Sequence, residues 1–87
     1  MFENLHDKVG VLATFSPQSK QSVYVRPYLM QWKGRRYKID VMGGHHFAKR
    51  GQKRVLVCGF SSGSNDFTLE FDPETFEWTL VEVFYGS

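Results

Sequence analysis

Three kinds of side chain in this sequence could do chemistry: a histidine pair, a single cysteine and a series of cations. His45 and His46 are adjacent in GGHHFAKRGQKR, and Cys58 lies inside the apolar run VLVCGF. Adjacent residues of an extended chain point to opposite sides, and neither the i, i+4 histidine spacing nor a C-x-x-C pair occurs. We therefore expect no metal site, and we expect Cys58 to be a small buried residue rather than a nucleophile.

The acidic residues give no catalytic pattern either. The sequence has no G-x-S-x-G motif, no phosphate-binding loop and no dinucleotide fingerprint. A chain of 87 residues also leaves little room for both a core and a desolvated active site. We expect a non-enzymatic protein that uses no cofactor.

The cations are the strongest candidates for binding a partner. All 11 Lys and Arg lie at or before Arg54 with three acids, a formal +8, whereas the part from Val55 onward has six acids and no Lys or Arg, a formal −6. The candidate contact residues are Arg26, Lys33, Arg35, Arg36, Lys38, Lys49, Arg50, Lys53 and Arg54. Cations beside a glycine-rich turn can bind phosphate, but the same residues also suit a solvated connector over 43–54.

Two classes of partner follow from this division of charge. We favour protein–protein interaction or self-association through a β surface, in which the basic half of one chain meets the acidic half of another. The alternative is a nucleic-acid-binding module, in which the basic hairpin and the 43–54 loop contact single-stranded nucleic acid and rings such as Tyr24 or Phe47 stack on bases. The net charge of only +2 favours the first class, because the acidic segment could cancel the field of the basic one.

The elements that position these residues are expected to be strands. Short runs rich in Val, Phe, Tyr, Trp and Thr alternate with Gly, Asn, Ser and Pro, as in antiparallel β proteins. We expect six strands, at about 9–15, 23–32, 35–42, 54–61, 66–71 and 76–84, and a short helical turn over 2–8. Two strands are apolar on both faces, which is typical of a closed sheet or an oligomer interface. The prediction is one all-β domain over 1–87, a meander curled into a partly closed barrel or roll, or a β-sheet dimer.

The segment YLMQWKGRRYKIDV predicts a tight hairpin. Lys33-Gly34 forms a two-residue connection with glycine where a positive φ is needed, so Trp32 should pair with Arg35. One face then carries Tyr28, Met30, Trp32, Tyr37, Ile39 and Val41, and the other carries Gln31, Arg36, Lys38 and Asp40. A second hairpin, with its turn at Asp72-Pro73, should place Leu69, Trp78 and Leu80 in the core.

These two hairpins resemble a family of small, uncharacterised bacterial β-rich proteins, whose pattern is W-x-G-R-x-Y-x-V and, later, an acidic turn followed by W-x-L-x-x-V. The matching positions cover about half of the chain and are Pro27, Trp32, Gly34, Arg35, Tyr37, Ile39, Phe71, Asp72, Trp78, Leu80 and Val83. Met30 replaces a typical aromatic residue, and Phe76 stands where the turn commonly has glycine. The resemblance implies no catalytic residues. Some members of the family are encoded near components of DNA-damage-tolerance polymerases, and this gene neighbourhood alone implies a role related to nucleic acids.

The expected location is the cytoplasm. One cysteine cannot form an internal disulfide, which suits a reducing compartment. The start of the chain has no apolar stretch of signal-peptide length, and the longest apolar run is far below the roughly 18 residues that span a bilayer. We therefore expect neither secretion nor a membrane segment.

Overall fold

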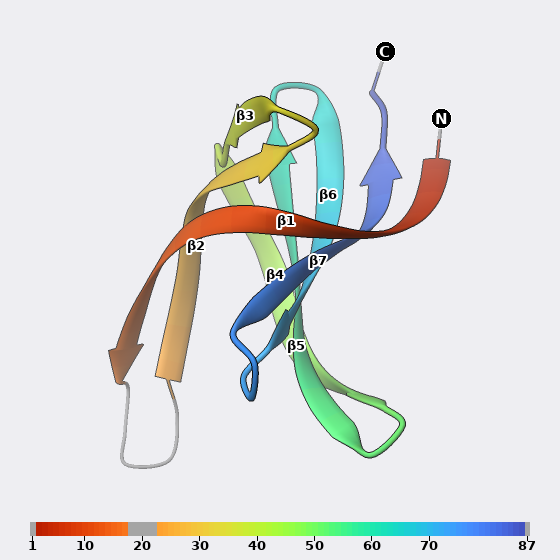
Figure 1. Cartoon of the computed structure of the whole chain (residues 1–87). Helices are drawn as coiled ribbons and strands as arrows, with labels where there is room; N and C mark the ends of the chain where they lie inside the picture. The colour runs from red at the N-terminus through yellow and green to blue at the C-terminus, as the bar shows by residue number, and fades with distance from the viewer. Residues whose placement is uncertain (1, 18–22, 87) are drawn as a thin grey trace.

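A single antiparallel sheet accounts for the part of the chain that the structure describes. The computed structural model covers residues 2–17 and 23–86, without the side chains of Ser16, Pro17, Val23 and Tyr24. The strands are β1 (Phe2–Pro17), β2 (Val23–Trp32), β3 (Arg35–Lys38), β4 (Val41–Arg50), β5 (Lys53–Ser62), β6 (Asn65–Asp72) and β7 (Glu77–Phe84). Their order in the sheet is β3-β2-β1-β7-β6-β5-β4 (Figure 1). The all-β prediction is confirmed, with seven strands rather than six.

The helical turn expected over 2–8 is wrong. These residues form the first half of β1, which pairs with β7 from Phe2 opposite Phe84 to Val9 opposite Trp78. The polar residues of this segment interrupt the apolar alternation that indicates a strand. The strand that pairs with it, β7, lies at the other end of the sequence. Only that distant pairing satisfies the backbone groups of this segment.

The loop expected over 43–54 is also wrong. This segment forms most of β4 and the start of β5, which pair along their length and turn at Gly51-Gln52. Gly51 has a positive φ of 66°, which glycine adopts without strain. The two glycines after Met42 coincide with a shift in the β4–β5 register rather than with a loop.

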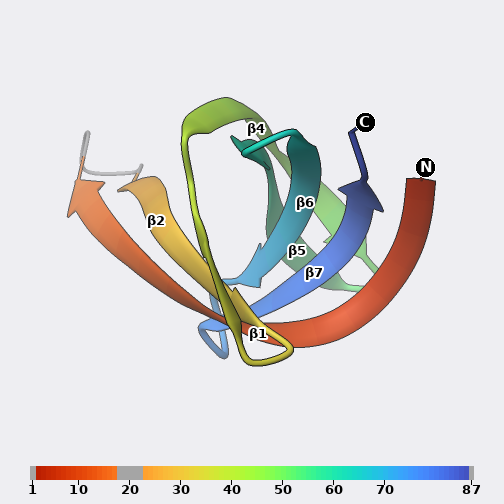
Figure 2. The ribbon, with the colours of Figure 1, turned by 90° about the horizontal axis from the view of Figure 1, so that it is seen from above.

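The sheet is curled but not closed into a barrel, and β1 pairs with β7 instead of following a simple meander. Its two edges, β3 and β4, are joined by residues 39–40 alone. The Ile39 N–H donates to the Tyr28 carbonyl oxygen at 3.0 Å, and the Asp40 N–H donates to the Ser61 carbonyl oxygen at 2.9 Å. This short link bends one edge toward the other, so the sheet wraps around its inner face (Figure 2).

The inner face holds the core, which joins the two ends of the sheet. The buried residues are Met30, Trp32, Leu56, Cys58, Phe60, Phe67, Leu69, Phe71, Trp78, Leu80 and Val83. The Tyr37 ring on β3 lies 5.3 Å from the Phe67 ring on β6, and the Trp32 indole N–H donates to Asp7 at 2.9 Å. Of the predicted core residues, Trp32, Leu69, Trp78 and Leu80 are buried as expected, whereas Tyr37 and Ile39 are only partly buried at the border of the core.

The β2–β3 hairpin has the predicted register, with Met30 opposite Tyr37 and Trp32 opposite Arg35. Both turn residues have positive φ, 51° at Lys33 and 75° at Gly34, as a type I′ turn requires.

Two residues expected on the inner face are instead exposed: Tyr28 by 47% and Val41 by 62%. Tyr28 has no partner where the β1–β2 register shifts, and Val41 begins the edge strand β4.

A shift of register also explains why the last strand reads as apolar on both faces. Val81 has no partner in β6 because the β6–β7 pairing shifts there, passing from Leu80 to Glu82. After the shift Val83 faces the core and is fully buried, although alternation from Leu80 would point it outward.

Candidate binding surfaces

The nine candidate cations lie in two groups at different places in the sheet. Arg26, Lys33, Arg35, Arg36 and Lys38 belong to β2, β3 and their turn, whereas Lys49, Arg50, Lys53 and Arg54 belong to the β4–β5 hairpin. All nine are exposed. The β2–β3 turn lies at the opposite end of the molecule from the β4–β5 turn, so the two groups do not form one continuous strip (Figure 1).

Acidic residues of β6 neutralise part of the β4–β5 group. Arg50 donates to one Glu70 carboxylate oxygen from two nitrogens, at 3.1 and 2.6 Å. Lys53 donates to Asp72 at 3.2 Å. These pairs form because β5 lies directly beside β6 in the sheet, with Leu56 opposite Phe71 and Val57 opposite Glu70. The outer face of the hairpin, on the side away from the core, therefore presents alternating charges.

The pKa values of Asp72 and Lys53 are shifted by the hydrogen bonds that these two residues form. The pKa of Asp72 is lowered first by the backbone N–H of Glu74, which donates to it at 2.9 Å, and then by Lys53. The pKa of Lys53 is raised, chiefly by its hydrogen bond to Asp72. Both shifts favour the charged forms, so the pair stays ionised at neutral pH.

The other two cations of this group, Lys49 and Arg54, lie on the opposite face of the hairpin. Lys49 pairs with Arg54 in the β4–β5 register, one position before the pair of Arg50 and Lys53. Because successive side chains alternate between faces, Arg54 lies on the opposite side of the hairpin from Arg50. Its guanidinium lies 4.2 Å from the centroid of the Phe47 ring, which is 53% exposed. The predicted 43–54 cluster is therefore divided between two faces.

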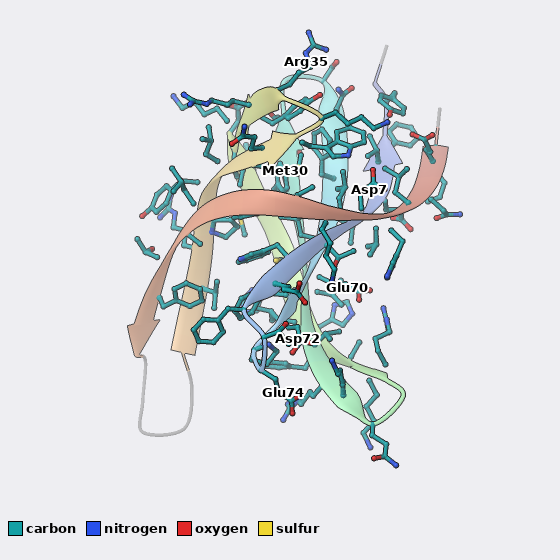
Figure 3. All side chains as sticks on the ribbon, viewed as in Figure 1. Asp7, Met30, Arg35, Glu70, Asp72 and Glu74 are labelled. Atoms are coloured by element: carbon teal, nitrogen blue, oxygen red, sulfur yellow. The ribbon has the colours of Figure 1, made fainter. Side chains whose placement is uncertain are left out.

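The β2–β3 group has no such neutralising neighbours. Residues 8–39 contain no Asp or Glu, and no described carboxylate forms an ion pair with Arg26, Arg36 or Lys38. The nearest acid in the sequence, Asp40, instead accepts the Gly63 N–H at 2.8 Å. Arg35 lies at the opposite end of the molecule from Asp72 and Glu74 (Figure 3).

Three of these cations share the outer face with exposed apolar side chains. Arg36 is opposite Gln31 and Lys38 is opposite Leu29, positions that alternate with the inward Met30 and Trp32. The Arg26 guanidinium lies 5.4 Å from the Tyr28 ring centroid. We call the surface formed by Leu12, Arg26, Tyr28, Leu29, Arg36 and Lys38 the basic face. The side chain of Tyr24, the other ring proposed to stack on bases, lies outside the described residues.

A groove between β1 and β7 was not anticipated from the sequence. The β1–β7 pairing ends at Val9 opposite Trp78, and beyond that point the described part of β1 pairs only with β2. Where the two strands separate, a groove of about 450 Å³ lies between them. It is lined mainly by Val9, Val11, Phe15, Phe71, Phe76 and Trp78. Lys8 and Glu77 form an ion pair of 3.6 Å at its rim.

Phe76 is the most unusual residue of this groove. It has a φ of 61°, a left-handed conformation that side chains other than glycine rarely adopt, and it is 70% exposed. Its ring stacks on the Phe15 ring, with centroids 6.1 Å apart, and lies beside the Phe71 ring, with centroids 5.8 Å apart. The signal that could have located the groove was present in the sequence, since Phe76 occupies a turn position where glycine is common.

The other chemistry-bearing residues form no catalytic or metal-binding arrangement within the described ranges. No group of three or more His, Cys, Asp or Glu there is placed to hold a metal ion. Cys58 is 3% exposed, and burial raises the pKa of its thiol to about 11, so it stays protonated at neutral pH. Over the same ranges, no helix is long and apolar enough to span a membrane.

No family model, curated protein or solved structure matches this chain. The resemblance to the W-x-G-R-x-Y-x-V family therefore stays a prediction.

Proposed function

We propose that this chain is a non-enzymatic binding module that takes up an extended segment of a partner protein in the groove between β1 and β7. Residues Gly10–Pro17 of β1 have one edge without a described strand partner, directly beside the apolar lining of the groove. A peptide that adds to a sheet edge gains main-chain hydrogen bonds, and adjacent apolar surface selects its side chains. The groove supplies both kinds of contact.

The observation that carries the proposal is the conformation of Phe76. A bulky residue in the left-handed region costs roughly 1–2 kcal/mol, which glycine would avoid. Phe76 recovers part of that cost through contacts with Phe15 and Phe71 but leaves most of its ring in water. An exposed strained ring beside a free strand edge is explained if a partner covers it.

The remaining reactive groups support binding rather than catalysis. The Cys58 thiol is buried and protonated, and Glu70 and Asp72 are paired with Arg50 and Lys53. None of these groups lines the groove.

The test selects displayed, extended peptides of about ten residues against the wild-type chain and measures their affinity for variants. Phe76→Gly relieves the strained backbone while removing the ring, so we expect the melting temperature to change by less than about 4 °C and peptide affinity to fall at least about tenfold. Phe84→Ala is the matched control, because Phe84 is 49% exposed but lies outside the groove.

Bound peptide should also slow amide hydrogen exchange in 10–17, where new strand hydrogen bonds would form. Peptides that bind Phe76→Gly as well as wild type, or that protect β4 instead, would contradict the proposal. A wild-type dimer that becomes monomeric on Phe76→Gly substitution would identify a second copy of the chain as the partner.

A further inference from the structure

The geometry points to a second binding surface, independent of the groove: we infer that the basic face binds single-stranded nucleic acid. Arg26, Arg36 and Lys38 would contact phosphates, and Tyr28 would stack on a base. Proteins that bind single strands without sequence preference combine a cationic track with exposed rings, and this face has three cations and one described exposed ring, that of Tyr28.

The charge of the face favours an anionic partner. Arg36 and Lys38 are two residues apart on β3, so their side chains leave the same side of the strand about 7 Å apart. Arg26 adds a third cation on the neighbouring strand β2. With no acid between residues 8 and 39, nothing in this part of the sheet compensates these charges.

A second copy of the chain is a poor anionic partner. Among the acidic residues of β6, β7 and the turn between them, Asp66, Glu74 and Glu82 form no described ion pair, whereas Glu70, Asp72 and Glu77 are paired within their own chain, with Arg50, Lys53 and Lys8. Docking the paired residues onto the basic face of another copy would exchange one set of ion pairs for another. A nucleic acid carries a negative charge on every phosphate, so it offers the basic face more available charge than three carboxylates do.

The exposed Tyr28 ring distinguishes a nucleic acid from an acidic peptide. Tyr28 is 47% exposed at the register shift of β1 and β2, and Arg26 approaches its ring at 5.4 Å. Leu12, 64% exposed, and Leu29 add apolar surface to the same face. Stacking on a base uses the exposed ring, whereas a polyglutamate segment would need only the cations.

The β4–β5 hairpin provides a matched comparison on the same molecule. Arg50 and Lys53 are neutralised by β6, and Arg54 lies on the opposite face over Phe47. Changing these three residues removes the same number of positive charges as changing Arg26, Arg36 and Lys38. The two triple variants therefore separate a specific surface from a general effect of net charge.

The experiment measures fluorescence anisotropy of a labelled single strand of about twelve nucleotides at about 50 and 200 mM salt. The variant R26S/R36S/K38S should bind at least about tenfold more weakly, and its slope of log affinity against log salt should be smaller by about 2, as expected for three lost phosphate contacts. The variant R50S/K53S/R54S should stay within about threefold of wild type. Melting curves establish that both variants fold.

Tyr28 provides the second measurement. Tyr28→Ala should weaken binding several-fold, and Tyr28→Phe should restore it, because stacking needs the ring and not the hydroxyl. Phe76→Gly should leave oligonucleotide binding unchanged, which separates this inference from the groove.

Three results would overturn the inference: no binding by wild type, equal losses in the two triple variants, or a polyglutamate peptide that binds as tightly as the oligonucleotide. The last result would assign the face to an acidic protein segment.

Discussion

The two basic regions of this chain carry similar numbers of cations, but only one of them is partly neutralised by described acidic residues. Arg50 and Lys53, in the β4–β5 hairpin, pair with Glu70 and Asp72 of β6. Arg36 and Lys38, in β3, have no described acidic partner. The difference comes from the neighbouring strand in the sheet. β5 lies beside the acidic β6, whereas β2 lies beside a part of β1 that contains no acidic residue.

The cations of the two regions also differ in their structural settings. Both regions include an edge of the sheet, and charged side chains on an edge strand discourage pairing with other chains. That role is sufficient for the β4–β5 hairpin, in which Arg50 pairs with Glu70 and Arg54 lies over the Phe47 ring. That role applies to Arg26 as well, because β3 pairs only with Leu29–Trp32 and the earlier part of β2 is also an edge. Arg26 differs from the cations of β4 in that it approaches the exposed Tyr28.

The largest expected effect concerns the core that joins the two regions. Trp78 is buried beside Phe71, with ring centroids 4.7 Å apart, and Trp78→Ala should lower the free energy of unfolding by about 3 to 5 kcal/mol. Both regions should unfold in one transition, because residues from the two ends of the sheet share this core. The measurement is amide hydrogen exchange in β3 and β5 during thermal unfolding. A β2–β3 hairpin that stays folded after β5 has unfolded would show that the two regions are independent folding units.

The turns allow each region to be disturbed separately. Gly34 and Gly51 have φ of 75° and 66°, and an added Cβ would meet nothing within 4 Å at either position. Gly34→Val and Gly51→Val should therefore each cost about 1 to 3 kcal/mol through backbone strain alone.

Chemical denaturation measures those two costs, and oligonucleotide binding distinguishes their consequences. Gly34→Val should weaken binding because it disturbs β2 and β3, while Gly51→Val should not. Equal weakening by the two substitutions would remove the distinction between the regions.

The smallest effect concerns the neutralised pair. Lys53→Ser should raise the pKa of Asp72 toward its ordinary value of 3.8 but not fully, because the Glu74 N–H is the larger cause of the lowered pKa. Lys38→Ser should leave that pKa unchanged. Titration of the Asp72 carboxyl resonance by NMR checks both.

The sign for stability follows from the same shift. A lowered pKa in the folded state stabilises the fold above the pKa of unfolded Asp, and this contribution is lost as pH falls through the folded value. Lys53→Ser should therefore reduce the stability lost on acidification below about pH 4. An Asp72 pKa that returns fully to its ordinary value would show that Lys53, not the Glu74 N–H, is the main cause.

Local patterns predicted the hairpins well. The β2–β3 register, the positive φ of Gly34 and the turn after Asp72 all follow from short-range chemistry: residue alternation, a two-residue turn and Asp-Pro. Most of the predicted core follows from the same alternation, because side chains of period two leave few choices of face.

Features that depend on distant partners were missed. The first half of β1 reads as polar, and only its pairing with β7 makes it a strand. β4 reads as a glycine-rich basic loop, and only its pairing with β5 makes it an edge of the sheet. The exposed positions of Tyr28 and Val41 depend on a register shift and on an edge, which alternation does not reveal.

The sequence by itself determined that this protein is an all-β chain with two tight hairpins and a division of charge between its basic and acidic parts, because turn chemistry, alternation and composition are local properties. Only the tertiary structure decided which cations are neutralised and where β1 separates from β7. The physical reason is that ion pairs and strand edges depend on which strands become neighbours, and neighbours such as β1 and β7 come from opposite ends of the chain. The cations of the β4–β5 hairpin are therefore partly neutralised, whereas those of the basic face have no described acidic partner.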